Sequence, residues 1–375
     1  MNIGILKETG SENRVALTPE LAAQFIMLNT KVFLENGAGS GAYLLDDAYE
    51  QAGVKVAGRK EIYDQADCIL TVTPPPAEEI STWGNGKILA GGLDPYNAKP
   101  LIDALTTQRI TAFSLELVPR TTLAQSMDIL SSMATIAGYR AVLEAASLLP
   151  RFFPMFMTAA GTVKPAKVLI LGAGVAGLQA LATARRLGAI VEVFDVRSAV
   201  KEEVLSLGGK FIEVEGAKED AAAGGYAIEQ SAEFKQKQHN LIHQHALKSN
   251  VVICTAQIPG KPAPRLLEKE TVDAMAGGSV IIDLASATGG NCELTRNNEV
   301  VRHNGVTILG RSDYPSLMPL DASRMFGNNL MNFARLFVTT EGFNFPWNDE
   351  IILKSCLTHE GKLVNEKIIQ FYSVQ

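Results

Sequence analysis

Three glycines in the pattern G-x-G-x-x-G are the residues whose spacing points most directly to chemistry. Gly172 permits a tight turn, Gly174 lets the backbone approach a pyrophosphate, and Gly177 lets a helix pack close to a strand. The pyrophosphate then lies at the helix N-terminus, where unpaired N–H groups and the helix dipole favour an anion. Because Val175 and Ala176 form that first turn, these five residues are predicted to bind a dinucleotide.

An acidic residue at the end of the next predicted strand, Asp195, selects among dinucleotides. It lies about 20 residues beyond the glycines, where a carboxylate accepts hydrogen bonds from both ribose hydroxyls. An acid at this place repels a 2′-phosphate, so NAD(H) is favoured over NADP(H). Arg197 weakens this preference, and Val196 between them is expected to contact the cofactor as well. The alternative is a glycine-rich turn with an Asp that caps a helix.

Further cofactor contacts are expected from four residues outside the glycine motif: Ser131, Thr255, Ala256 and Gln257. A fifth, Tyr226, is the single aromatic residue of the small, polar, glycine-containing residues 215–230. A stretch of this length in an α/β domain is typical of a functional lid. An exposed insertion without a role fits its composition equally well.

A loop with Arg120, Gln125 and Asp128 joins the predicted strand 110–115 to a long helix expected over residues 125–149. Clefts between α/β domains, at the carboxyl ends of strands, are places where ligands bind. The three groups can position a nicotinamide carboxamide or a phosphate, but they make a poor general base at neutral pH. A plain ion pair between Arg120 and Asp128 explains the spacing equally well.

Dehydrogenases that oxidise a C–OH or C–NH₂ group need a general acid/base beside the nicotinamide, and no histidine is suitably placed. None of the five is expected to lie at the end of a strand of the first domain. His239, His243 and His245 share a polar helical stretch. The first two are one turn apart and would suit a metal ion, but a solvated helix face is favoured, and no metal site is predicted.

Strand-like and helix-like segments alternate along the chain, which predicts a parallel α/β architecture. We expect two Rossmann-like domains with a cleft between them, the second carrying the glycine motif. Residues 1–130 plus 322–375 would form a discontinuous first domain, residues 131–150 a connecting helix, and residues 151–321 the NAD(H)-binding domain. A non-periodic region should follow the connecting helix, and the chain should end in a short irregular tail. Predicted strands of the second domain include residues 167–171, 190–194, 251–255 and 306–310.

Composition argues against several classes of protein. The 375 residues are 47% hydrophobic and 20% charged, as in a globular protein, and the formal net charge is −6. That charge disfavours nucleic acid and anionic membrane surfaces. We find no secretory signal and no segment apolar enough to span a bilayer. The four cysteines lie far apart, which argues against disulfides or zinc and favours the cytoplasm.

Several stretches resemble the NAD(H)-binding component, domain I, of the proton-translocating NAD(P) transhydrogenases. They extend over nearly the whole chain and form a highly specific pattern. Besides the glycine motif they are residues 120–140 (RTTLAQSMDILSSMATIAGYR), 153–163 (FPMFMTAAGTV), 195–197 (DVR), 206–212 (SLGGKFI), 224–227 (GGYA), 258–264 (IPGKPAP) and 279–291 (SVIIDLASATGGN).

Alanine dehydrogenases are similar in fold and share the opening patterns GILKE at residues 4–8 and RVALTP at residues 14–19. Their catalytic Lys lies in a stretch that matches residues 69–73, where this sequence has only Thr. Their catalytic His falls at Asp94 and their catalytic Asp at Ala287. The machinery of an amino-acid dehydrogenase is therefore missing, and such an enzyme is the alternative interpretation.

The resemblance implies a function, a cofactor and partners. Arg120, Gln125 and Asp128 would hold the nicotinamide of NAD(H), and the region of Tyr226 would be the family's mobile loop. Hydride would pass directly from NADH to NADP⁺ on a separate domain III, with no general base. The implied partners are a second copy of the chain, a proton-translocating membrane domain and the NADP(H)-binding domain III. They would hold this cytoplasmic chain at the inner membrane. A catalytically silent NAD(H)-binding protein is a third interpretation.

Overall fold

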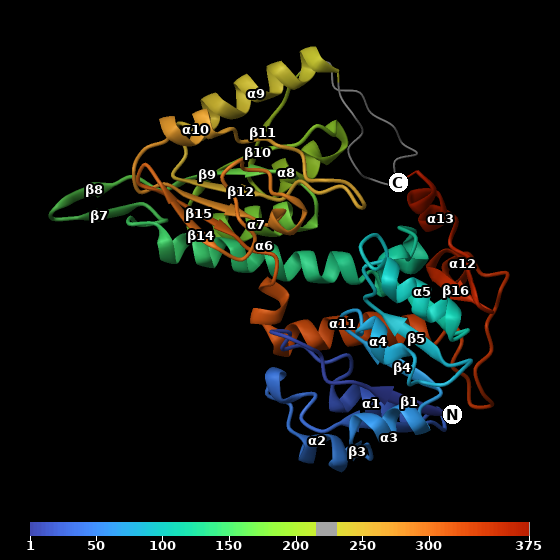
Figure 1. Ribbon diagram of the computed structural model, residues 1–375. Helices are drawn as coiled ribbons and strands as arrows, with labels where there is room; N and C mark the ends of the chain where they lie inside the picture. The colour runs from blue at the N-terminus through green and yellow to red at the C-terminus, as the bar shows by residue number, and fades with distance from the viewer. Residues whose placement is uncertain (215–230, 375) are drawn as a thin grey trace. The chain divides into compact units, whose positions relative to one another are not determined.

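The computed structural model describes residues 1–214 and 231–374 and divides into two compact units. The first comprises Met1–Met133 and Pro315–Gln375, and the second comprises Ala134–Tyr314. Helix α6 (Ile129–Leu148) carries the chain from the first unit into the second. Each unit contains a sheet of mainly parallel strands with helices, which confirms the predicted Rossmann-like α/β class (Figure 1).

The first unit is built on an eight-stranded sheet. In spatial order its strands are β17 (Lys362–Leu363), β16 (Cys356–His359), β6 (Thr111–Ser114), β5 (Ile88–Gly91), β4 (Cys68–Thr71), β1 (Asn2–Ile5), β2 (Lys31–Glu35) and β3 (Lys55–Ala57). The strands from β6 to β3 are parallel, whereas β16 runs antiparallel to both β6 and β17. Its helices are α1 (Pro19–Ile26), α2 (Asp46–Gln51), α3 (Arg59–Gln65), α4 (Ala77–Ile80), α5 (Lys99–Thr107), α11 (Pro319–Ala334), α12 (Glu350–Ser355) and α13 (Glu366–Ser373).

The C-terminal tail is not irregular, so that prediction was wrong. Its last residues form α12, β16, β17 and α13, and β16 extends the first sheet. These elements are short, between two and eight residues, so their apolar residues show too few repeats to reveal a period.

The second unit is built on a seven-stranded sheet. In spatial order its strands are β11 (Lys210–Ile212), β10 (Ile190–Phe194), β9 (Lys167–Leu171), β12 (Val251–Cys254), β13 (Val280–Asp283), β15 (Val306–Gly310) and β14 (Val300–His303). β14 runs antiparallel to β15, and the other strands are parallel. Its helices are α7 (Val175–Arg186), α8 (Lys201–Ser206), α9 (Ala232–Ala246) and α10 (Lys269–Ala274).

Helices cover both faces of this second sheet. Val168 and Ile170 of β9 belong to a core cluster with side chains of α6 and α7, whereas Leu169 and Leu171 belong to a cluster with side chains of α9 and α10. Burial on both faces explains why the strand reads as a continuous apolar run. The strand order reverses between β9 and β12, and ligands bind outside the carboxyl ends of strands at such a point.

A β-hairpin occupies the region after α6 in which the sequence shows no periodicity. Strand β7 (Phe156–Thr158) pairs with β8 (Gly161–Val163), and the hairpin projects from its unit (Figure 1). Buried Phe153 anchors its base, since the Phe153 carbonyl accepts a hydrogen bond from the Ala166 N–H at 2.9 Å. Both strands are almost wholly exposed, so neither shows the alternation of a half-buried strand.

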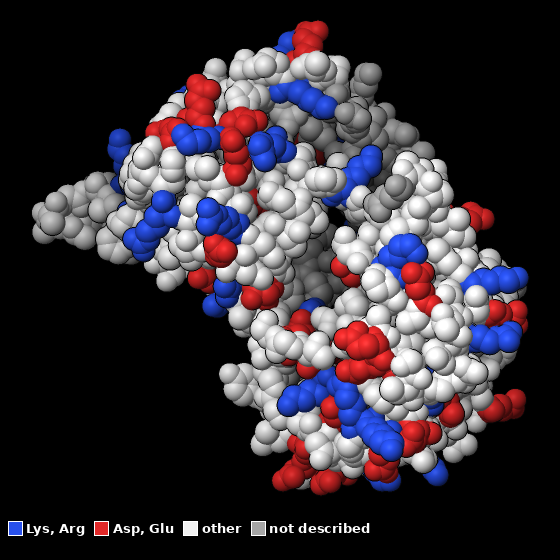
Figure 2. Space-filling model, viewed as in Figure 1, with Lys and Arg blue, Asp and Glu red and all other residues white. Residues whose placement is uncertain are grey.

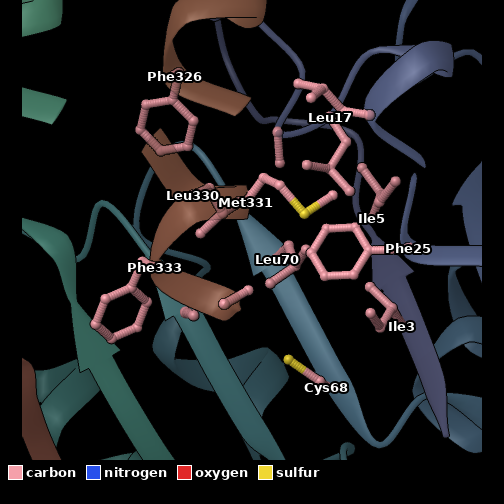
Figure 3. Close-up of a cluster of buried hydrophobic side chains, with 14 of the residues drawn as sticks. Ile3, Ile5, Leu17, Phe25, Cys68, Leu70, Phe326, Leu330, Met331 and Phe333 are labelled. Carbon is pink, nitrogen blue, oxygen red and sulfur yellow. The ribbon is translucent and has the colours of Figure 1, made fainter. Parts of the chain in front are cut away.

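The core of the first unit joins segments from the two ends of the chain. Figure 3 shows Ile3 and Ile5 of β1 beside Phe25 of α1, with Leu330 and Met331 of α11 packed against the same group. Deleting a buried aliphatic side chain of this kind typically costs about 2–5 kcal/mol. In the part of the chain that the structure describes, no helix is long and apolar enough to cross a membrane.

Candidate functional site

The glycine motif lies between β9 and α7, and its three glycines occupy different surroundings. Gly172 has φ +108°, and a Cβ there would lie 2.5 Å from Thr255 Oγ1. A Cβ on Gly177 would lie 1.9 Å from the Gly172 carbonyl oxygen, so only glycine lets the helix approach the strand end this closely. A Cβ on Gly174 would meet no atom of residues 1–214 or 231–374 within 4 Å. The backbone at Gly174 therefore faces open space that a ligand can enter.

The N-terminus of α7 opens onto that same space. α7 has twelve residues, and Val175 in its first turn is 42% exposed, with Ala176 half-buried behind it. The first N–H groups of a helix have no intrahelical acceptor and carry the positive end of its dipole. The arrangement of open backbone and free helix end fits a pyrophosphate group.

Asp195 follows the end of β10, and its carboxylate is almost wholly engaged. Oδ2 accepts hydrogen bonds from Ala173 N and Arg197 Nη2, both at 2.7 Å, and Oδ1 accepts from Arg197 N and Nε, both at 2.9 Å. The side chain of Asp195 is 6% exposed. The hydrogen bond to Asp195 raises the pKa of the Arg197 guanidinium. Half-buried Val196 packs against the apolar cluster under β10.

Thr255, Ala256 and Gln257 continue from β12 and lie beside the glycine motif. Thr255 Oγ1 donates to the Gly172 carbonyl at 3.0 Å, and a Cβ on Gly172 would lie 3.3 Å from the Ala256 nitrogen. Gln257 Nε2 donates to the carbonyl of Leu284 at 2.8 Å. The structure thus brings this predicted group together with the glycines, whereas predicted Tyr226 lies outside the described residues.

The loop before α6 is a 3₁₀ helix, Thr122–Met127, so the long helix begins at Ile129 and not at Gln125 as predicted. Asp128 ends the loop. Its Oδ1 accepts from Ser131 N at 2.9 Å and its Oδ2 from Ser131 Oγ at 2.6 Å, so its carboxylate caps the helix. Arg120 and Gln125 of the same segment are exposed.

Two asparagines that the sequence analysis missed hold this loop to α11. Asn329 Nδ2 and Asn332 Nδ2 donate to the carbonyl of Ser126 at 2.8 and 3.1 Å. They lie three residues apart and therefore on one face of the helix. That spacing of two amides was the available signal.

The prediction that no histidine ends a strand of the first domain was wrong, because His359 is the last residue of β16 in the first sheet. β16 runs antiparallel, so His359 lies at the opposite edge from the carboxyl ends, where its Nδ1 is 3.1 Å from Thr111 Oγ1. His243 Nδ1 lies 2.9 Å from Thr271 Oγ1. Among the described residues, no group of three His, Cys, Asp or Glu side chains is arranged to hold a metal.

Two carboxylates at the carboxyl edge of the first sheet were also missed. Glu8 accepts from Val72 N at 2.7 Å and from Thr73 N at 3.0 Å, while Glu116 accepts from Asp94 N at 2.9 Å and from Ser114 Oγ at 2.6 Å. Burial raises the pKa of both groups above its ordinary value. Each joins the ends of neighbouring strands, a contact between remote segments that leaves no pattern in the sequence.

Gly138 of α6 is a further residue that the sequence analysis left without a role. A Cβ at Gly138 would lie 2.1 Å from the carbonyl oxygen of Ala176, in the first turn of α7. Glycine therefore lets α6 pack directly against the backbone that opens the candidate pyrophosphate site. An isolated glycine within a helical pattern was the signal.

Comparisons with known proteins cover both units. Residues 4–137 match the N-terminal domain and residues 141–366 the C-terminal domain of the alanine dehydrogenase/PNT family. The chain is 45% identical over 376 residues to an NAD(P) transhydrogenase alpha-subunit chain of Rhodospirillum rubrum, covering 97% of this chain and 98% of that one. The solved transhydrogenase from Sinorhizobium meliloti is similar, with a TM-score of 0.88 and 42% identity over 97% of this chain and 100% of that chain. Alanine dehydrogenase of Methanococcus maripaludis is 28% identical, covering 100% of this chain and 97% of that protein.

Proposed function

Because the chain belongs to the alanine dehydrogenase/PNT family, on the side of the NAD(P) transhydrogenase alpha subunits, we propose that it binds NAD(H) on its second unit. When bound, NADH supplies a hydride to NADP⁺ held on a separate partner domain. The observation that carries this proposal is the open backbone at Gly174, the residue that caps the N-terminus of α7. In this account the chain is one catalytic component of a larger proton-translocating transhydrogenase.

Different residues of the second unit are assigned to different parts of the cofactor. Gly174, Val175 and Ala176 offer backbone N–H groups to the pyrophosphate, and Gly172 and Gly177 allow the close packing that shapes this turn. Asp195 is assigned to the ribose of the adenosine half, whose hydroxyls would compete with the Arg197 guanidinium for the carboxylate, and Val196 lies beside it. The segment Thr255–Ala256–Gln257 lies across the switch point from Asp195 and so is assigned to the nicotinamide half.

Arg120, Gln125, Asp128 and Ser131 are assigned to the nicotinamide. Asp128 holds the start of α6 and accepts a hydrogen bond from the Ser131 hydroxyl at 2.6 Å, which orients the Ser131 side chain that we assign to the carboxamide. Exposed Arg120 and Gln125 supply donors for the ring's substituent. Their contribution to the rate is the positioning of two nicotinamide rings, because hydride exchange between such rings moves no proton.

The alanine dehydrogenase alternative is disfavoured by what lies at β4. An amino-acid dehydrogenase needs a group beside the substrate that accepts a proton. The segment that would carry the catalytic Lys has Thr71, Val72 and Thr73 instead. The N–H groups of Val72 and Thr73 both donate hydrogen bonds to the carboxylate of Glu8. This favours direct hydride exchange over oxidation of an amine.

The projecting hairpin supports the proposal that the chain works as a homodimer. Met155, Phe156 and Met157 are 59%, 42% and 75% exposed, and the hairpin carries no charged side chain, as Figure 2 shows at the left. A two-stranded hairpin is marginally stable alone, and apolar patches of this kind mark interfaces. The further partners are the membrane domain and the NADP(H)-binding domain, which would hold the chain on the cytoplasmic face of the inner membrane.

The experiment is a titration of the purified chain with NADH and NADPH, followed by an assay with L-alanine and NAD⁺. The proposal predicts that NADH binds more tightly than NADPH and that alanine produces no NADH. Formation of NADH from alanine by the chain alone would establish the amino-acid dehydrogenase instead. Failure to bind NADH would remove the cofactor assignment altogether.

A further inference from the structure

Asn291 holds the backbone of Ala256 at two points. Its Oδ1 accepts from the Ala256 N–H at 3.0 Å, and its Nδ2 donates to the Ala256 carbonyl at 2.9 Å. The same Nδ2 donates to the Pro264 carbonyl at 2.7 Å. Asn291 is completely buried, so both donors and the acceptor of its amide are used inside the protein.

The loop that presents Asn291 is itself fixed by a buried carboxylate. Asp283, at the end of β13, accepts from Cys292 N at 3.0 Å, from Thr295 Oγ1 at 2.7 Å and from Ala285 N at 3.0 Å. A Cβ on Gly290, where φ is +80°, would lie 2.8 Å from Asp283 Oδ2, so the loop closes tightly over this group. Asn291 therefore projects from a rigid support.

These contacts form a continuous path to the glycine motif. Asp283 fixes the loop, Asn291 fixes Ala256, and Thr255 Oγ1 donates to the Gly172 carbonyl at 3.0 Å. Since the Ala256 N–H and carbonyl both face Asn291, these two groups are committed to the protein. The Thr255 N–H and hydroxyl are likewise engaged, with the carbonyls of Leu171 and Gly172, and Gln257 Nε2 is engaged with Leu284. The Thr255 carbonyl and the backbone of Gln257 are therefore the groups that we assign to the ligand.

We propose that Asn291 is a positioning residue for the nicotinamide half of NAD(H), acting through the segment Thr255–Gln257. The inference rests on the proposed NAD(H) site. Asp195, which follows β10 on one side of β9, is assigned to the adenosine half of the cofactor. The segment after β12, on the other side of β9, is assigned to the nicotinamide half. Loosening that segment weakens contacts to the nicotinamide half and leaves the adenosine half in place.

The test compares Asn291→Ala with Asn250→Ala, because Asn250 supports the same two strands at their opposite ends, where its Oδ1 accepts from Lys167 N at 2.9 Å. NADH and ADP affinities are measured for the folded wild type and both variants. We expect Asn291→Ala to weaken NADH binding by about tenfold and ADP binding by less than about twofold, with Asn250→Ala close to wild type for both ligands. Hydrogen exchange at residues 255–257 should accelerate only in Asn291→Ala.

If Asn291→Ala does not fold, Thr295→Val removes one hydrogen bond to Asp283 and should show the same NADH-selective loss at smaller size. Equal losses for NADH and ADP, or unchanged affinities in a variant with lowered thermal stability, would overturn the positioning role while the wild-type site stands. A wild type that binds neither ADP nor NADH would overturn the proposed function itself.

Discussion

Arg197 and Asp195 form a bidentate ion pair, in which Nε donates to Oδ1 at 2.9 Å and Nη2 donates to Oδ2 at 2.7 Å. The Asp195 carboxylate should repel the 2′-phosphate of NADP(H), but it also pairs with the Arg197 guanidinium, which would bind such a phosphate. Cofactor preference is therefore a property of the pair and not of Asp195 alone.

This pairing predicts the effect of Asp195→Asn. Removal of the negative charge frees the Arg197 guanidinium for a 2′-phosphate, so the ratio of NADPH to NADH affinity should rise by roughly tenfold or more, about 1.4 kcal/mol. Titration of both reduced cofactors measures it. The double variant Asp195→Asn with Arg197→Ala should lose the gain, and a gain that persists without Arg197 would refute this explanation.

Gly138→Ala should displace the first turn of α7, against which Gly138 of α6 packs. The new methyl group would meet the Ala176 carbonyl at 2.1 Å, and such overpacking typically costs about 1–3 kcal/mol. We expect a lower Tm together with weaker NADH binding, because Ala176 belongs to the first turn of α7. Gly277→Ala is the matched control, since a Cβ there meets nothing within 4 Å, and its Tm should not fall. Equal behaviour of the two variants would contradict the packing argument.

The parts that the sequence predicted well are those fixed by local pattern. Strands β9, β10 and β15 have the predicted bounds, because each is a run of apolar residues that ends at a turn. The glycine motif was placed correctly for the same reason. The short strands β3, β14, β16 and β17 were not predicted, since each has two to four residues and includes a polar side chain, whereas the equally short β12 is a purely apolar run.

The site was predictable only in part. The sequence indicated Asp195 and the glycines, but it held no sign that Asn291 binds Ala256, and the spacing of Asn329 and Asn332 did not identify Ser126 as their partner. These bonds join a side chain to the backbone of a remote segment, so neither partner's residue type is constrained by its neighbours. Asp128 was identified, yet its role as the cap of α6 depended on where the helix begins.

The contributions of two half-buried carboxylates to stability should respond to pH with opposite sign. Burial raises the pKa of Glu116 above its ordinary 4.5, so its contribution to stability is complete below that pH and is lost as the pH rises. Burial opposes ionisation of Glu12, but the hydrogen bonds and charge of Arg14 outweigh it and lower its pKa, so its contribution is lost as the pH falls. Urea unfolding of Glu116→Gln and Glu12→Gln from pH 4 to 8 measures both.

The expected result is a divergence. The stability advantage of wild type over Glu116→Gln should shrink with rising pH, and that over Glu12→Gln should grow. Parallel curves for the two variants would show that at least one assigned shift has the wrong sign.

Met157→Asp should abolish the proposed dimer. A carboxylate at this position of β7, where Met157 is 75% exposed, would have to lose its water in an apolar interface. Sedimentation should then report a monomer with an unchanged Tm at low protein concentration. Met27→Asp, at a 79% exposed methionine of the first unit, should leave the dimer intact. A dimer that survives Met157→Asp would exclude the hairpin as its interface.

Gln125→Ala should separate binding from catalysis. Gln125 is assigned to the orientation of the nicotinamide, and misplacement of a reacting ring by ~1 Å can slow a reaction by roughly a hundredfold. We therefore expect a much slower single-turnover hydride transfer with an NADH affinity within about threefold of wild type. Gln51→Ala, at an exposed position on α2, is the control. An unchanged transfer rate would remove Gln125 from the site.

Direct hydride transfer between two bound nucleotides is the central claim, and one measurement tests it. The purified chain is mixed with an isolated NADP(H)-binding domain of a transhydrogenase loaded with NADP⁺, NADH is added, and transfer is followed by stopped flow. The account predicts rapid formation of NADPH that requires both proteins and is insensitive to L-alanine and pyruvate. NADH that binds to the chain but never reduces the partner's NADP⁺ would contradict it and would leave a protein that only holds the cofactor.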